Sequence, residues 1–160
     1  MQSITSQAFA ALNDEEVVWA CIGPYIDDIR GRDFETKKAV YLQLTPGLKA
    51  LLAFQVLYGH TGLGVQEFYD HLAYLLPHTG VWSILKKGME YYGDHALSHL
   101  LTEMEDLYHQ MEKGTHIDAP ELEIVINKLN RSLHEQIPVS LKTIGDHIRQ
   151  HPAEFIVIED

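Results

Sequence analysis

The segment from Leu44 to Gly59 reads LTPGLKALLAFQVLYG and combines a helix start signal with helical spacing of its apolar residues. Thr45 is a good N-cap residue, and Pro46 suits the first helical position because its missing N–H would have no partner there. The apolar residues that follow recur at helical spacing: Leu48, Leu51, Leu52, Val56 and Leu57. This stretch therefore predicts a helix whose apolar face lies in the core.

Helical signals recur on both sides of this stretch. Asn13 is an N-cap residue before three acidic residues, whose charge favours a helix N-terminus, and Gly23-Pro24 is expected to kink or end that helix. Further helical segments are expected over residues 25–29, 34–43, 65–76, 81–92, 94–112, 121–136 and 140–150. Pro138 is expected to separate the last two. The sequence predicts a compact all-α single domain over residues 1–160, a bundle of about seven helices.

The C-terminal run Phe155-Ile156-Val157-Ile158 is the one strand-like segment of the sequence. A strand needs a partner, and we find no second convincing strand in the rest of the chain. We therefore expect an extended C-terminal tail that packs on the helices without joining a sheet.

The chain contains a single cysteine, Cys21, so no internal disulfide can form. Its neighbours Val17, Val18 and Ile22 predict a buried thiol, which fits a reducing cytoplasm. Residues 1–11 lack the basic region of a signal peptide, and no apolar run reaches the ~18 residues that a membrane span needs. We expect a cytoplasmic protein without a membrane partner.

The charge of the chain is acidic and unevenly distributed. Acidic residues number 23 against 12 basic ones, which gives a net charge of -11. Residues 1–35 hold seven acids against two arginines, residues 36–66 hold three lysines and no acid, and residues 67–112 hold eight acids against two lysines. Such a field repels nucleic acid and attracts basic proteins. The alternative is that the charge serves only solubility.

The predicted partner is accordingly a basic protein, such as a DNA-binding regulator or a toxin, and a homodimer is a further alternative. Direct nucleic-acid binding is not expected. The predicted contact face consists of acids from the most acidic helical stretch: Glu90, Asp94, Glu103, Glu105, Asp106 and Glu112. Their alternative role is the solvated polar face of two consecutive helices.

Aromatic residues gather around the turn at residues 59–64, whose three glycines exclude a helix interior. The spacing matches neither the P-loop nor the dinucleotide-binding fingerprint, so nucleotide binding is not expected. Most of the aromatic side chains should belong to the core. Tyr58, Tyr69 and Trp82 could instead line a groove, since Tyr and Trp are common interface anchors.

Histidine pairs supply the main metal-binding pattern, and we expect no cofactor. His95 and His99 are four residues apart, Glu103 lies a further four along, and His147 and His151 form a second such pair. Residues four apart share a helix face, and two imidazoles with a carboxylate can hold zinc or iron. A helical metal-binding enzyme using His95, His99 and Glu103 is therefore an alternative. No catalytic motif supports it, and the chain is predicted to be no enzyme.

The middle of the chain resembles a known family. The relevant motifs are the segment 44–51, the glycine turn, Gln66-Glu67-Phe68-Tyr69, and Met89-Glu90-Tyr91-Tyr92-Gly93 with Ala96 and Leu97. They resemble the DNA-mimic-protein-like family of bacterial domains of unknown function, over about Gln43 to Tyr108 and more weakly over Ile144 to Phe155. The usual family turn is Asn-Gly-Gly-Phe, whereas this chain has Thr61-Gly62-Leu63-Gly64-Val65.

The resemblance implies an all-helical, non-enzymatic protein. In the family's namesake, an acidic face stands in for DNA phosphates and occupies a transcription factor. Carboxylates spaced along helices can face Arg and Lys side chains that otherwise contact a backbone with one charge per ~1.7 Å. An immunity-type inhibitor of a basic toxin or nuclease is the alternative that acidity alone supports.

Overall fold

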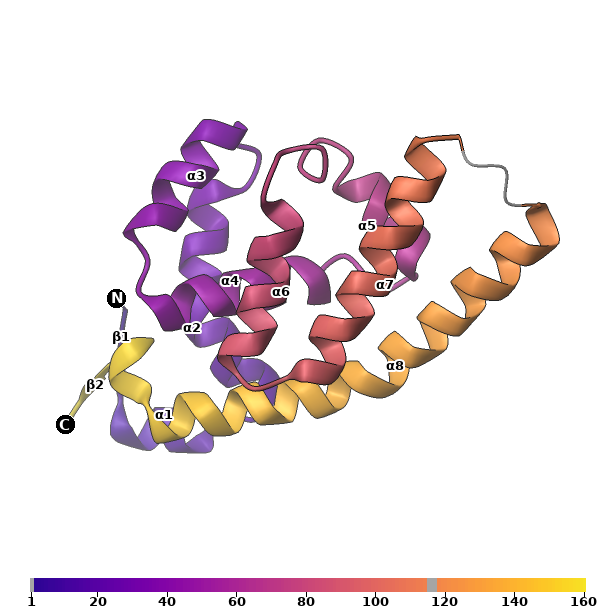
Figure 1. The fold of residues 1–160 in the computed structure, drawn as a ribbon. Coiled ribbons are helices and arrows are strands. Elements are labelled where there is room, and N and C mark those ends of the chain that lie inside the picture. The colour runs from indigo at the N-terminus through magenta and orange to yellow at the C-terminus, as the bar shows by residue number, and fades with distance from the viewer. Residues whose placement is uncertain (1, 115–117) are drawn as a thin grey trace.

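The computed structural model describes residues 2–114 and 118–160, and these form eight α-helices, one 3-10 helix and one two-stranded sheet (Figure 1). The helices are α1 (Ser6–Ala11), α2 (Asp14–Ile29), α3 (Phe34–Gln43), α4 (Pro46–Tyr58), α5 (Val65–His71), α6 (Val81–Tyr91), α7 (His95–Glu112), α8 (Ala119–Gln150) and the 3-10 helix η1 (Pro152–Glu154). The strands are β1 (Ser3–Thr5) and β2 (Val157–Glu159). The predicted all-α bundle is confirmed, with one more helix than the seven expected.

The core is built around α4, as the sequence predicts. Leu51, Phe54 and Leu57 of this helix are fully buried. α4 packs against α6 and α2, and α6 in turn packs against α7. Gly88 permits the close approach of α6, because a Cβ atom at this position would lie 2.6 Å from the Cβ of Ala53.

The helix starts follow the capping residues of the sequence. Asn13 and Glu16 form a reciprocal capping box at α2, and the Leu48 N–H donates to Thr45 Oγ1 over 3.2 Å at α4. α2 continues through Pro24 to Ile29, so the predicted resumption after the proline is confirmed. α5 is shorter than expected, since turns replace the helix between His71 and Pro77.

The prediction that Pro138 divides two helices is wrong, because α8 is one helix of 32 residues with Pro138 inside it. A proline in a helix removes one N–H donor and kinks the chain. Pro138 and His134 are both solvent-exposed. The carbonyl of His134, which loses its helical hydrogen bond to the proline, is therefore on the solvent-facing side of the helix. Buried Leu133 and Ile144 hold the two halves on the bundle, and α8 bends along its length (Figure 1).

The prediction that the C-terminal tail joins no sheet is also wrong. β2 pairs in parallel with β1, in a register that places Ile4 beside Ile158. The partner strand contains only three residues and so leaves no recognisable pattern in the sequence. The tail is held by the buried side chain of Phe155, which packs so closely over Gly47 that a Cβ there would lie 2.7 Å from its ring.

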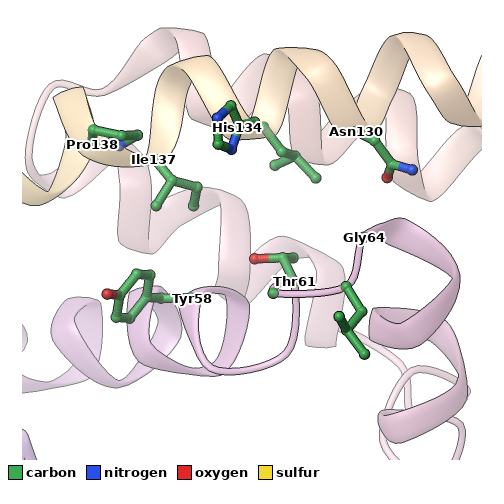
Figure 2. Close-up of a pocket in the computed structure, with 10 residues that line it drawn as sticks. Tyr58, Thr61, Gly64, Asn130, His134, Ile137 and Pro138 are labelled. Atoms are coloured by element: carbon green, nitrogen blue, oxygen red, sulfur yellow. The ribbon is translucent and has the colours of Figure 1, made fainter.

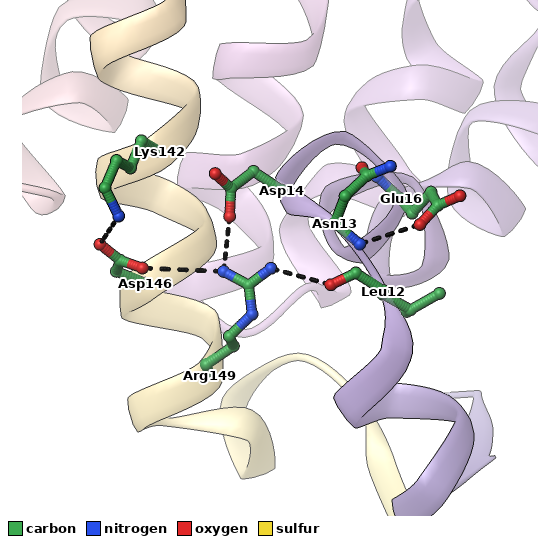
Figure 3. Close-up of polar contacts among 7 residues, drawn as sticks. All are labelled: Leu12, Asn13, Asp14, Glu16, Lys142, Asp146 and Arg149. Atoms are coloured by element: carbon green, nitrogen blue, oxygen red, sulfur yellow. Dashed lines mark hydrogen bonds and ion pairs between the residues drawn. The ribbon is translucent and has the colours of Figure 1, made fainter.

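An ion-pair cluster fastens the C-terminal end of α8 to the start of α2 (Figure 3). Arg149 Nη1 lies 2.5 Å from Asp14 Oδ1, and Nη2 donates to the Leu12 carbonyl over 3.0 Å. Gly145 leaves room for this contact, because a Cβ there would lie 2.6 Å from Asp14 Oδ1. The cluster joins residues more than 130 positions apart in the chain.

Cys21 is buried, with 2% of its surface exposed, as predicted. Burial raises the pKa of its thiol to about 12, so the sulfur stays protonated at neutral pH. Among the helices of residues 2–114 and 118–160, none has both the length and the apolar character needed to cross a membrane.

Candidate functional site

The predicted contact face divides into residues that serve the fold and residues that face solvent. Asp94 belongs to the first group and does not lie on the surface, because only 7% of it is exposed. Its carboxylate accepts hydrogen bonds from the Leu97 N–H, the Gln136 amide and the Ser140 hydroxyl. Asp94 caps α7 and joins it to α8, so it is not available to a partner.

Two further acids are paired with lysines of neighbouring helices. Glu103 Oε1 lies 3.1 Å from Lys128 Nζ on α8, and Glu105 Oε2 lies 2.6 Å from Lys86 Nζ on α6. Glu90 is exposed and accepts a 3.3 Å hydrogen bond from Ser98 Oγ. These contacts neutralise Glu103 and Glu105, so the free charge of the face lies on its other exposed acids.

The free charge gathers where α7 ends and α8 begins. Asp106 and Glu112 are exposed on α7, Glu121 and Glu123 are exposed on α8, and none of the four pairs with a cation that the structure describes. Residues 103–127 contain seven acids and one lysine, so their net charge of 1 - 7 = -6 is more than half of the total of -11. We call residues 103–114 and 118–127 the acidic arm.

The acidic arm also exposes apolar side chains. Met111 is 42% exposed and Ile124 is 69% exposed, on α7 and α8 respectively. Glu121, Glu123 and Ile124 were not among the residues predicted from the sequence. A charge count that continued past Glu112 into the next helix would have found the two acids.

The three aromatic residues predicted to line a groove do not lie together. Tyr69 and Trp82 are buried and pack in a cluster with Phe68 and Tyr108, with ring centroids 5.5 to 6.0 Å apart. Tyr69 Oη donates to the Met104 carbonyl over 2.6 Å, and burial raises the pKa of this phenol. These two side chains serve the core.

Tyr58 does line a cavity, together with the glycine turn and α8 (Figure 2). The cavity has a volume of about 410 Å³, and Thr61, His134 and Pro138 are among its walls. Asn130 Oδ1 accepts the Val65 N–H over 2.9 Å and so caps α5 from the opposite helix. Gly64 has a φ of 107°, and a Cβ there would lie 2.7 Å from Asn130 Oδ1, so the turn requires glycine.

The histidines predicted as weak metal candidates do not form a ligand set. His95 and His99 are exposed, and Glu103 is engaged with Lys128. Among the residues that the structure describes, no group of three or more His, Cys, Asp and Glu side chains is arranged to hold a metal ion. The geometry therefore gives no support to the metal-binding alternative.

The second histidine pair lies in an aromatic cluster near the C-terminus. The rings of His147 and His151 are 4.8 Å apart, and His147 also contacts Tyr91, Tyr92 and Phe155 at centroid distances of 5.2 to 6.0 Å. Burial lowers the pKa of His147, whose Nε2 atom is buried without a hydrogen-bond partner in the described part of the chain. This cluster fastens the C-terminal segment to α8.

Comparison with known proteins identifies no relative of this chain. No protein family model, no curated protein and no solved structure matches the chain. The resemblance to the DNA-mimic-protein-like family thus stays a prediction from the sequence.

Proposed function

We propose that this chain is an acidic, non-enzymatic interaction protein that binds a basic protein surface through the acidic arm. The single observation that supports the proposal is the gathering of exposed acids where α7 ends and α8 begins, within a stretch of sequence, residues 103–127, whose net charge is -6 before the Glu103 and Glu105 ion pairs are counted. Asp106, Glu112, Glu121 and Glu123 expose carboxylates there, without a cation partner among the described residues. Carboxylates that are not neutralised within the fold remain available to the arginines and lysines of a partner.

Electrostatic attraction would act on association first. A field of one sign steers an oppositely charged partner and raises the association rate, and salt screens the effect within about 8 Å at physiological ionic strength. A DNA-binding regulator presents such a basic surface, so the arm would compete with DNA for it. The proposal places this interaction in the cytoplasm, where the single thiol of Cys21 remains reduced.

The test uses two triple variants of equal charge. Asp106→Lys, Glu112→Lys and Glu123→Lys alter the acidic arm, whereas Asp28→Lys, Asp70→Lys and Glu135→Lys alter exposed acids outside it. Each set changes the formal charge from -11 to -11 + 6 = -5. Untagged wild-type protein and both variants are used to capture partners from lysate of the source organism at low and high salt, with identification by mass spectrometry.

We expect wild type and the control variant to retain a basic DNA-binding protein at low salt, and the arm variant to lose it. High salt should release the partner from all three proteins. A partner that survives both high salt and the arm substitutions contradicts the proposal. Equal loss from both variants would mean that overall charge, and not the arm, attracts the partner.

A further inference from the structure

A second cavity lies on the other side of Tyr58, between the start of α2 and the end of α4. It has a volume of about 560 Å³, and its walls include Glu15, Glu16, Trp19, Gln55 and Tyr58. Two carboxylates and two large aromatic rings therefore share one cavity, and none of its lining residues is a lysine or arginine. This combination is complementary to an organic cation.

The two carboxylates differ from their neighbour Asp14 in how the fold uses them. Asp14 is neutralised by Arg149. Glu15 and Glu16 pair with no cation in the described chain, and each uses one oxygen in a hydrogen bond: Glu15 Oε1 accepts from Tyr58 Oη over 2.8 Å, and Glu16 Oε2 accepts from the Asn13 N–H over 2.8 Å. The second oxygen of each carboxylate is free to accept from a ligand.

The two aromatic rings are held in place before any ligand binds. The indole of Trp19 lies against the backbone of Gly23, where a Cβ would come within 2.9 Å of it, and 44% of Trp19 remains exposed. The ring of Tyr58 stacks on Phe54 at a centroid distance of 5.6 Å and an interplanar angle of 8°. Rings that are already ordered lose little entropy when a ligand stacks on them.

We propose that this cavity binds the guanidinium group of an arginine from the basic partner, stacked on Trp19 and Tyr58 and paired with Glu15 and Glu16. Arginine is preferred over lysine because its planar guanidinium both stacks on aromatic faces and donates to two carboxylates. The inference rests on the proposed function only for the origin of the arginine in a protein partner. The cavity itself is separate from the acidic arm.

The test is a titration of the protein with the peptide acetyl-Gly-Arg-Gly-amide, followed by the fluorescence of Trp19. The chain has two tryptophans, and Trp82 is buried with 4% exposed, so Trp82→Phe leaves Trp19 as the sole reporter. Calorimetry on the wild-type chain gives the same affinity without this core substitution. The control peptide carries citrulline, which keeps the shape of arginine and removes its charge.

We expect saturable binding of the arginine peptide and none of the citrulline peptide. Glu15→Gln with Glu16→Gln should weaken binding about tenfold or more, because charge-assisted hydrogen bonds are lost. Glutamine keeps an acceptor for Tyr58 and for the capping box, so the fold should be unaffected. Equal binding of both peptides, or an unchanged affinity in the double variant, would overturn the inference.

The outcome is independent of the proposed function. If the arginine peptide binds wild type and the arm variant alike while no basic partner is captured, the cavity stands and the proposed function fails. If a partner is captured through the arm while the peptide does not bind, the proposed function stands and the cavity inference fails.

Discussion

The two ends of α8 differ in what they do for the molecule. The C-terminal end has buried Ile144 and Ile148, and Arg149 ties it to α2. The N-terminal end begins with exposed acidic residues, and residues 119–125 contain no buried side chain. One continuous helix therefore has an anchored end that holds the fold together and a charged end that contributes little to packing.

Stability and surface charge are therefore separated along the same helix. Substitutions at the anchored end should lower the free energy of unfolding, whereas those at the charged end should change the interactions of the protein and leave the fold intact. Four matched pairs of substitutions test this separation, and the first has the largest expected effect.

The largest contrast is between two isoleucines of α8. Ile148 is fully buried and Ile124 is 69% exposed. We expect Ile148→Ala to lower the free energy of unfolding by about 2–5 kcal/mol, because it removes a buried side chain and leaves a cavity. Ile124→Ala should change it by less than about 0.5 kcal/mol. Urea denaturation followed by circular dichroism measures both, and similar losses would break the comparison.

The next contrast is between two N-cap aspartates. Asp94 caps α7 and also binds Gln136 and Ser140 in the interior, whereas Asp118 caps the exposed start of α8. We expect Asp94→Ala to cost about 2–3 kcal/mol, from the lost cap and the buried donors left unpaired. Asp118→Ala should cost about 1 kcal/mol or less. Urea denaturation measures the free energy of unfolding of both variants. A larger decrease for Asp118→Ala than for Asp94→Ala would contradict the expected order.

A smaller contrast concerns two ion pairs. The side chains of Arg149 and Asp14 are 32% and 34% exposed, whereas Lys128, the partner of Glu103, is 60% exposed. We expect Arg149→Met to cost about 1 kcal/mol and Lys128→Met less than about 0.5 kcal/mol, because water and salt screen the exposed pair. Raising the salt concentration should reduce the Lys128 effect further. If the Lys128 substitution costs more, the start of α8 is anchored after all.

The smallest effect is a dependence on pH at the anchored end. Burial, and then the neighbouring His151, lower the pKa of His147 from its ordinary value of 6.5, while Glu154 opposes the shift. The unfolded chain therefore takes up this proton first as the pH falls. The stability that neutral His147 contributes is complete above about pH 6.5 and is lost below it.

The substitution His147→Phe keeps an aromatic ring in the cluster and removes the titration. We expect the loss of stability between about pH 7.5 and about pH 5.5 to be smaller in this variant than in wild type. His134→Phe, at an exposed position of the same helix, is the control. An unchanged pH dependence in His147→Phe would show that other groups, such as the half-buried His60, dominate it.

Local signals explain the parts of the fold that the sequence predicted. N-caps at Asn13, Thr45 and Asp94 act within three residues of themselves, so the starts of α2, α4 and α7 were predicted correctly. The signal at Pro138 was also local, but the continuation of α8 depends on burial on both sides of it. The β1–β2 ladder depends on residues more than 150 positions apart, which no local pattern reveals.

The candidate sites were harder to predict, because exposure is a tertiary property. Asp94 has the same charge as Asp106, yet Ser140, 46 residues away, draws Asp94 into the interior. The sequence does not distinguish Trp19 from Trp82. Only the packing of the helices decides that Trp82 is buried while Trp19 faces a cavity. The charge density could be counted along the sequence. Which acids are paired and which are free depends on the fold and could not be predicted.

The parallel pairing of β1 with β2 has a mechanical consequence. Tension applied to the chain ahead of Ser3 and beyond Glu159 pulls the two strands in opposite directions along their ladder. The evenly spaced hydrogen bonds are then sheared together and not peeled apart one after another. Because such a force reaches the helices only after this ladder has yielded, a sheet of three residue pairs is the first part of the fold to resist extension of the chain.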